Sequence, residues 1–380
     1  MNPPSLLQVV ERLERLAGKL PSRIQKAVLG ELTPLKQLFL QQRPPRFLFT
    51  GSAKIPAREI IGALFGQADF TGTDDAAAPV CHWFDISFPE RGKISVLDAR
   101  GADDSAAIRI QDELKYCPAD IIFFLAAGRI AQEREELADL KRYLTGNRTS
   151  ETGSKIIEII IPPLEKAVVR DHGDLTVSRF EYALPSNLAR RAAFLETLRL
   201  VPAGPHQTPQ LLPPEAQRFM SILARELPNE ARMEIIRISR NREAQHEVAQ
   251  LLVKSTTAVS AAIGAQPIPL ADLPILTSLQ LMMISGIMYV SGRERSLRAA
   301  AEFAGALGAN VGAAMLLREG TRAMLKFFPG WGNVVCGLVA GSGTYAIGRA
   351  ATAFFIDGVS LKDARRTYRE NRKRRRRYSP

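Results

Sequence analysis

The chain has 380 residues, with 51 Lys and Arg against 39 Asp and Glu, a formal net charge of +12, and 46% hydrophobic residues. This length and balance exclude a disordered polyelectrolyte and a polytopic membrane protein, and they predict two or three globular domains. The three cysteines, Cys81, Cys117 and Cys336, show no Cys-x-x-Cys spacing, which excludes a disulfide-stapled secreted fold and a cysteine-based zinc site. Acidic residues interrupt the apolar pattern of the segment MNPPSLLQVVERLERLAGKL, so it is not expected to be a secretory signal, and the expected compartment is the cytoplasm.

Apolar residues recur at helical spacing on either side of Pro21, over residues 5–41. This spacing predicts two amphipathic helices, and the proline between them predicts a break. Residues 1–42 are therefore expected to form an N-terminal helical hairpin.

From residue 43 the pattern changes to short apolar runs that alternate with amphipathic segments. Runs such as KISVLD and ADIIFFLAA are nearly continuous in apolar residues, as a sheet buried on both faces requires. We expect an α/β doubly wound domain over residues 43–228, closed by a helix at 213–228, while residues 162–213 show no regular pattern. The expected strands are 46–50, 82–88, 93–98, 119–126 and 156–161, and the expected helices are 57–66, 105–116 and 131–144.

A glycine turn follows the first expected strand, and a helix follows the turn. This setting can bind phosphate, because backbone N–H groups and a helix N-terminus converge on the anion. The segment reads Gly51-Ser-Ala-Lys-Ile-Pro-Ala-Arg58, and the strand KISVLD continues as Asp98-Ala-Arg-Gly101. In this order, these features resemble the P-loop and the D-x-x-G element of the bacterial small GTPases of the Era and TrmE type. The resemblance implies a P-loop-like fold and a vestigial nucleotide site of Gly51, Lys54, Arg58, Asp98 and Gly101.

The loop departs from the phosphate-binding pattern G-x-x-x-x-G-K-[ST] at three consecutive positions. Pro56 has no backbone N–H, Ala57 stands where a lysine would contact the β- and γ-phosphates, and Arg58 stands where a hydroxyl would bind Mg²⁺. The segment Pro162-Pro163-Leu164-Glu165 falls where the family carries its guanine-reading N-K-x-D. We therefore expect a non-catalytic pseudo-GTPase domain with no metal and no required cofactor.

Two other interpretations of this region stay open. Lys54 and Arg58 can attract an anion at a helix N-terminus, which would leave weak GTP binding or a divergent NTPase. Alternatively, Gly51 and Asp98 simply mark turns in an α/β domain with no GTPase ancestry. The histidines do not point to metal chemistry, because His82, His172, His206 and His246 lack metal-ligand spacing.

From residue 229 to residue 358 the sequence is rich in Ala, Gly, Leu, Ile and Met, which predicts an all-α, Gly/Ala-rich helical domain. The motifs Pro267-Ile-Pro269, Ala271-Asp272 and Leu279-Gln280, with the glycine-rich helices that follow, resemble the hydrophobic helical domain found after the GTPase module in YcjF-type inner-membrane proteins. That resemblance implies a position at the inner membrane and carries no defined activity.

Two uncharged stretches, 273–292 and 327–348, are long enough to span a bilayer, which needs about 20 predominantly apolar residues. The Lys and Arg residues between them would lie across the membrane in a two-pass topology, which the positive-inside rule disfavours. A domain that is peripheral or partly inserted at the cytoplasmic face is therefore expected, and a soluble bundle is the alternative. Glycines at helical spacing would allow close helix packing within the domain or between two copies of the chain: Gly305, Gly308, Gly312, Gly337, Gly341 and Gly348.

Residues 359–380 are expected to form a basic tail, because ten Lys and Arg stand against two acidic residues from position 362 onward. Beside an apolar helix, such a cluster is attracted to an anionic membrane surface. Nucleic acid is a competing partner, although Tyr368 and Tyr378 offer little stacking surface, and a solubilising end that binds nothing is a third interpretation. The residues expected to contact the membrane or another anion are Arg372, Lys373, Arg374, Arg375, Arg376 and Arg377.

Together, these patterns predict a non-catalytic, GTPase-derived regulatory or scaffold protein that works with an unidentified protein partner at the cytoplasmic face of a bacterial membrane. The two alternatives are a divergent GTP-binding NTPase and a protein that binds nucleic acid through its basic tail.

Overall fold

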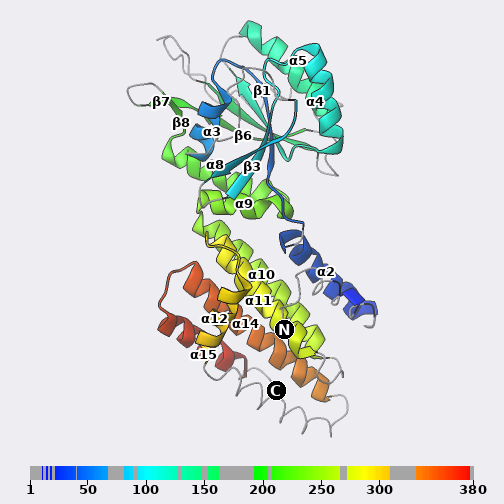
Figure 1. The fold of residues 1–380 in the computed structure, drawn as a ribbon, viewed down its shortest axis with the longest axis vertical. Coiled ribbons are helices and arrows are strands. Elements are labelled where there is room, and N and C mark those ends of the chain that lie inside the picture. Colours follow the sequence, from blue (N-terminus) through cyan, green and yellow to red (C-terminus); the bar gives the residue numbers. More distant parts are fainter. Residues whose placement is uncertain are drawn as a thin grey trace. The chain divides into compact units, whose positions relative to one another are not determined.

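A computed structural model of the chain divides into two compact units, Arg43–Ser239 and Met1–Gln42 with Arg240–Pro380. We call them the α/β unit and the helical unit (Figure 1). Apart from four isolated positions near the N-terminus, the structure describes residues 22–39, 41–66, 81–88, 92–126, 130–147, 153–161, 192–203, 208–265, 272–308 and 331–376.

The α/β unit is built on a six-stranded sheet with the order β2-β3-β1-β4-β5-β6. The edge strand β2 is antiparallel to β3, and the other neighbouring strands are parallel. This mixed sheet confirms the predicted α/β class and its first five strands. The strands are β1 (Arg46–Gly51), β2 (Phe84–Phe88), β3 (Gly92–Asp98), β4 (Ile121–Ala126), β5 (Ser154–Ile160) and β6 (Ala192–Arg199).

Helices cover both faces of the sheet, because alternate residues of each strand point to opposite sides. One core contains Phe47 and Phe49 of β1 and packs under α3 (Ala57–Phe65), α8 (Pro213–Glu226) and α9 (Asn229–Ser239). The other core contains Leu48 and packs under α4 (Asp104–Tyr116) and α5 (Ile130–Gly146). Near-continuous apolar strands are thus explained by burial on both sides.

Two features of the α/β unit differ from the sequence expectation. Strand β6 and the short hairpin of β7 (Val201–Ala203) and β8 (Thr208–Gln210) lie in a region where no regular element was expected. Helix α9, expected at the start of the helical domain, lies in the α/β unit, where its Glu234 carboxylate accepts a hydrogen bond from the Lys93 backbone N–H of β3 (3.1 Å).

The helical unit is organised around α10 (Arg242–Gly264), which packs against α14 (Trp331–Phe355), α11 (Asp272–Val290) and α2 (Ser22–Phe39). Helix α2 buries Leu32, Leu35 and Leu38. It is the second helix of the expected N-terminal hairpin, and the first helix lies almost entirely outside the described residues. Helix α12 (Leu297–Leu307) packs against α11 and α15 (Leu361–Arg376).

Glycines bring α14 close to α10. A Cβ atom on Gly337 would lie 2.8 Å from the backbone oxygen of Ala261, and one on Gly348 would lie 2.5 Å from Cγ2 of Val253. By contrast, no described atom lies within 4 Å of the Cβ position of Gly305 in α12. The glycine spacing of α14 therefore serves close packing within this chain.

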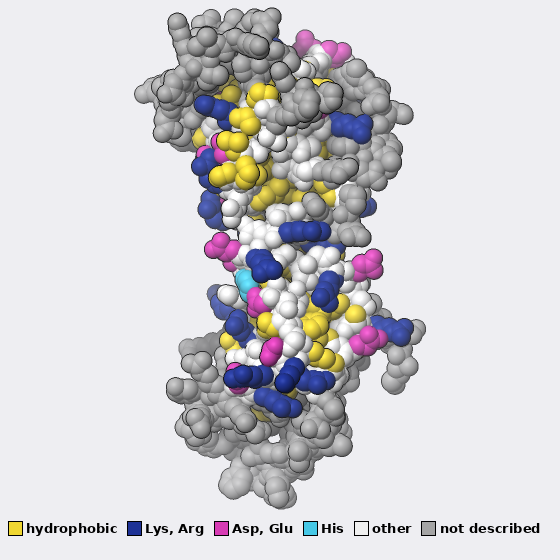
Figure 2. Space-filling view, turned by 90° about the vertical axis from the view of Figure 1, so that its left-hand side faces the viewer, with side chains coloured by type: hydrophobic (Ala, Val, Ile, Leu, Met, Phe, Trp, Pro, Cys, Tyr) yellow, Lys and Arg dark blue, Asp and Glu magenta, His cyan; other side chains and the backbone are white. Residues whose placement is uncertain are grey.

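The basic segment forms a helix up to Arg376. Ser360 caps α15, because its hydroxyl accepts a hydrogen bond from the Asp363 backbone N–H (3.2 Å). Ala364 is fully buried where α15 packs against α14, while Lys362 and Arg369 are exposed. Lys and Arg side chains group on the lower, helical part of the view in Figure 2, with Asp and Glu side chains among them. Within the described residues, no helix combines the length and apolarity needed to cross a bilayer.

Candidate functional site

The predicted nucleotide-site residues gather at the carboxyl edge of the sheet. Gly51 ends β1, Asp98 ends β3, and these two strands are neighbours. The chain passes from β1 toward β3 on one side and returns to β4 on the other, so this edge is a topological switch point. In open α/β sheets, such points form the crevice in which ligands bind.

Gly51 is required by the backbone at this turn. Its φ is +94°, and a Cβ atom here would lie 2.4 Å from the backbone oxygen of Leu125 in β4. The next residue, Ser52, donates its backbone N–H to the same oxygen (2.9 Å). The loop therefore leaves the sheet pressed against the end of β4, a path that any side chain at position 51 would block.

The loop then enters α3 (Ala57–Phe65) through Pro56. Pro56 precedes the helix with φ −55° and ψ 141°, and no side chain caps its N-terminus. Lys54 and Arg58 both have exposed side chains. These two cations thus lie on the loop and on the first turn of α3, away from the buried interior of the site.

A buried arginine that sequence analysis passed over occupies the centre of this edge. The side chain of Arg100 is only 4% exposed, and its guanidinium forms a two-point ion pair with the Asp98 carboxylate, with Nε–Oδ1 at 2.7 Å and Nη2–Oδ2 at 2.8 Å. Nη1 donates to the backbone oxygen of Ile55 at 2.7 Å and lies 3.4 Å from that of Ser52. Arg100 therefore joins the loop after β3 to the loop after β1.

The glycine of the Asp98–Gly101 element completes this contact between loops. Gly101 has φ +67°, and a Cβ atom there would lie 3.8 Å from the Cβ of Ala53. The structure thus brings Gly51, Asp98 and Gly101 to adjacent loops. Arg100, which links these loops, is the third residue of the D-x-x-G element, a position to which the sequence pattern assigned no role. An arginine two residues after an aspartate was the signal that could have identified it.

A second ionisable group lies near the same edge, on β5. Glu158 is 1% exposed and accepts a hydrogen bond from the Thr197 hydroxyl of β6 (3.0 Å). Burial raises the pKa of Glu158 to about 6, because desolvation disfavours the carboxylate more than the hydrogen bond favours it. Its chemistry is that of a carboxyl group whose charge changes near neutral pH.

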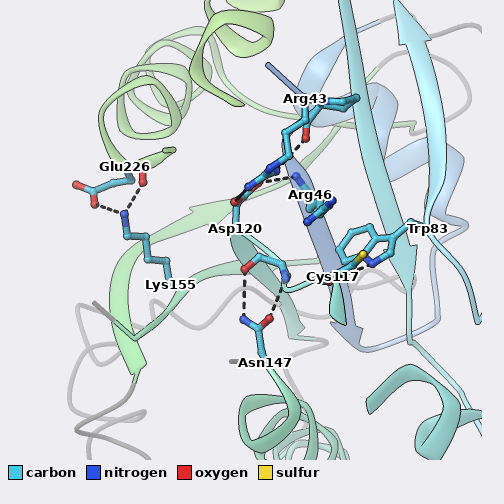
Figure 3. Close-up of polar contacts among 10 residues, drawn as sticks. Arg43, Arg46, Trp83, Cys117, Asp120, Asn147, Lys155 and Glu226 are labelled. Carbon is cyan, nitrogen blue, oxygen red and sulfur yellow. Dashed lines mark hydrogen bonds and ion pairs between the residues drawn. The ribbon is translucent and has the colours of Figure 1, made fainter. Parts of the chain in front are cut away.

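Structural polar contacts dominate the opposite, amino edge of the sheet (Figure 3). The Asp120 carboxylate accepts two hydrogen bonds from the Arg43 guanidinium (2.6 and 2.7 Å) and one from the Arg46 backbone N–H (2.9 Å). The Asn147 side chain accepts from the Ala119 backbone N–H (2.8 Å) and donates to its oxygen (3.3 Å). These groups satisfy one another and fix the strand starts.

Other predicted site residues are not brought into a described site. The side chains of Arg372, Lys373, Arg374, Arg375 and Arg376, and all of Arg377, lie outside the described residues, as does Pro162-Pro163-Leu164-Glu165. Among the residues that are described, no group of three or more His, Cys, Asp or Glu side chains is arranged to hold a metal ion.

Comparison of the sequence with protein-family models gives no match, and comparison with curated proteins gives none either.

Proposed function

We propose that this chain is a non-catalytic, GTPase-derived regulatory or scaffold protein whose α/β unit acts as a protein-interaction module. The observation that carries this proposal is the Asp98–Arg100 pair at the centre of the carboxyl edge. Both carboxylate oxygens of Asp98 accept hydrogen bonds from Arg100, so the aspartate of the D-x-x-G element is already neutralised by the chain itself.

The chemistry of phosphoryl transfer supports the same proposal. It depends on a lysine at the β- and γ-phosphates, a hydroxyl on Mg²⁺, and backbone N–H groups around the phosphates. Here Ala57 and Arg58 replace the first two, and Pro56 lacks the N–H. The backbone oxygens of Ser52 and Ile55, moreover, turn toward a cation, whereas a phosphate-binding loop turns its backbone N–H groups toward an anion.

Calorimetric titration of the full chain with GTP and Mg²⁺ tests the proposal, with ATP and Mg²⁺ as the comparison. We expect no submicromolar binding of either nucleotide. Submicromolar, Mg²⁺-dependent GTP binding would overturn the proposal and favour a divergent NTPase. Turnover that disappears in Lys54→Ala but persists in Lys115→Ala, an exposed lysine on α4, would establish that alternative.

We further propose that the protein works at the cytoplasmic face of a bacterial membrane, through a peripheral contact of the helical unit. The supporting feature is the composition of α15, LKDARRTYRENRKRRR, which contains nine basic residues and only two acidic ones. Each basic residue near an anionic bilayer contributes about 1 kcal/mol of attraction. Because Ala364 is fully buried, the first turn of α15 is part of the folded helical unit. A test must therefore remove the basic charges by substitution and not by deletion of the helix.

Liposome flotation tests this placement. Replacing Arg372, Lys373 and Arg374–Arg377 by Gln should abolish flotation with anionic vesicles of phosphatidylglycerol and phosphatidylethanolamine. Zwitterionic phosphatidylcholine vesicles, which have no net charge, should bind neither the unmodified chain nor this variant. A control that removes the same number of exposed charges from the α/β unit should float like the unmodified chain: Lys93, Arg109, Lys115, Arg199, Arg218 and Arg225 to Gln. Equal flotation of both variants would refute the proposal. Retention on nucleic acid that is lost only in the first variant, without flotation of the unmodified chain, would instead support the nucleic-acid alternative.

A further inference from the structure

We infer that Arg100 is a positioning residue that substitutes for a bound ligand: its buried guanidinium holds the loop between β1 and α3 in the shape seen here. This inference deepens the proposed non-catalytic function and rests on it. It assigns to a single side chain the organising role that a nucleotide would have in an active site of this layout.

The burial of Arg100 makes its partners obligatory. A guanidinium that is 4% exposed has lost most of its hydration, and this loss is tolerated only when a counter-ion and hydrogen-bond acceptors replace the water. Asp98 supplies the counter-ion through two parallel hydrogen bonds. The carboxylate is itself oriented by the Arg100 backbone N–H, which donates to Oδ1 at 3.2 Å.

The remaining donor group of Arg100 determines the shape of the other loop. Nη1 donates to the backbone oxygen of Ile55 at 2.7 Å, and that of Ser52 lies 3.4 Å away. Carbonyl groups on both sides of the loop therefore turn toward the same cation. A phosphate-binding loop turns its N–H groups toward an anion, so this loop has the opposite polarity at its centre.

The geometry also explains why this position requires arginine. The guanidinium carries its five N–H donors in a fixed plane, which allows a two-point pair with Asp98 and a further bond to Ile55 at the same time. A lysine ammonium is a single centre on a flexible stem and cannot span these acceptors. The pair is also local, because Asp98 and Arg100 are separated by one residue.

The test is hydrogen exchange of the loop amides of residues 52–55, followed by rescue with guanidinium. In Arg100→Ala, we expect these amides to exchange about tenfold faster or more, because the backbone oxygens of Ser52 and Ile55 lose the guanidinium that holds the loop in place. Guanidinium chloride at millimolar concentration, far below denaturing levels, should restore the slower exchange by entering the vacated space, while sodium chloride of equal ionic strength should not. Arg100→Lys should exchange as fast as Arg100→Ala.

Arg109→Ala is the matched control, because Arg109 is an exposed arginine on helix α4. In this variant, the amides of residues 52–55 should exchange as in the unmodified chain. If Arg100→Ala fails to fold, Asp98→Asn gives the second reading: it keeps the shape of the side chain, should speed exchange of the same amides, and should not respond to guanidinium. Unchanged exchange in the Arg100 variants, or rescue by sodium chloride, would overturn the inference. Nucleotide binding is measured separately on the unmodified chain, so tight GTP binding would refute the proposed function, whereas the Arg100 experiments would refute only this inference.

Discussion

The buried carboxyl group of Glu158 gives a stability prediction whose sign depends on pH. Glu158→Gln keeps the size of the side chain and an oxygen that can accept the Thr197 hydrogen bond, but it removes the ionisable group. The pKa of Glu158 is raised from 4.5 to about 6 in the folded chain. That difference corresponds to about 2 kcal/mol, since one pKa unit is worth about 1.4 kcal/mol.

The direction follows from proton linkage. Below pH 4.5 the group is protonated in both states, and burial of the neutral carboxyl adds no pH-dependent cost. Between pH 4.5 and about 6 the folded state holds the proton more tightly, so the free energy of unfolding falls as the pH rises through this window. Above it, the full cost of the buried charge is present. Glu158→Gln should therefore be more stable than the unmodified chain by about 2 kcal/mol at about pH 8, and the advantage should vanish toward about pH 4.

Urea unfolding followed by tryptophan fluorescence can measure this difference for the α/β unit alone. The chain has two tryptophans, Trp83 in the α/β unit and Trp331 in α14, so the comparison is made in a Trp331→Phe background. Thr197→Val is the complementary variant: it removes the hydrogen bond that favours the carboxylate and should cost stability at about pH 8 more than at about pH 4. A stabilisation by Glu158→Gln that does not vary with pH, or a destabilisation at high pH, would refute the reasoning.

Packing and buried polar contacts give three further predictions, each measured by thermal or urea denaturation. Gly348→Val should destabilise the helical unit by about 1–3 kcal/mol, because α10 leaves no room for the side chain. Gly343→Ala is the control: no atom lies within 4 Å of its Cβ position, so the change should be neutral or stabilise by up to about 1 kcal/mol. Equal effects of the two substitutions would contradict the packing of α14. Asn147→Ala should cost about 3 kcal/mol, since it strands both backbone groups of Ala119, and a cost near zero would show that water replaces the amide. Gly51→Ala should cost about 1–3 kcal/mol through its positive φ and its contact with β4, and a neutral result would mean that the loop has another available path.

Sequence patterns predicted the sheet well where burial on both faces produces long apolar runs. The strands expected at RFLFTG, KISVLD and IIFFLA match the observed strands β1, β3 and β4 to within a few residues. The residues of β6, AAFLETLR, include good helix formers and are mostly half-buried, so neither propensity nor periodicity indicated a strand. Their conformation comes from parallel pairing with β5, a tertiary contact that overrides local preference.

The location of the candidate site followed from the sequence, whereas its interior did not. Gly51 and Asp98 end adjacent strands because a glycine turn and an aspartate each follow an apolar run, and that pattern is local. The role of Arg100 depends on the direction of the carbonyl groups of Ser52 and Ile55, more than forty residues earlier in the chain. No residue pattern encodes that direction, so the side chain that links the two loops could not be distinguished from a surface arginine. Helix α2 was predicted from its apolar spacing, but its packing against α10 was not, since α10 begins some 200 residues later in the chain.

The glycine spacing of the helical unit does not by itself indicate a membrane. Small residues at helical spacing favour close helix packing in lipid and in water alike. In α14, that spacing is already used, because Gly337 and Gly348 face Ala261 and Val253 of α10 in the same chain. The pattern therefore needs neither a bilayer nor a second copy of the chain to explain it.

What remains specific to an anionic surface is the charge of α15. Its first turn is fixed to the bundle through Ala364, while its last residues form an unbroken basic run. An electrostatic contact of this kind weakens steeply with added salt, because screening shortens its range to about 8 Å at physiological ionic strength and to about 3 Å at 1 M. Insertion of apolar helices would not weaken in this way, so flotation repeated at high salt separates a peripheral contact, which should be lost, from partial insertion, which should persist.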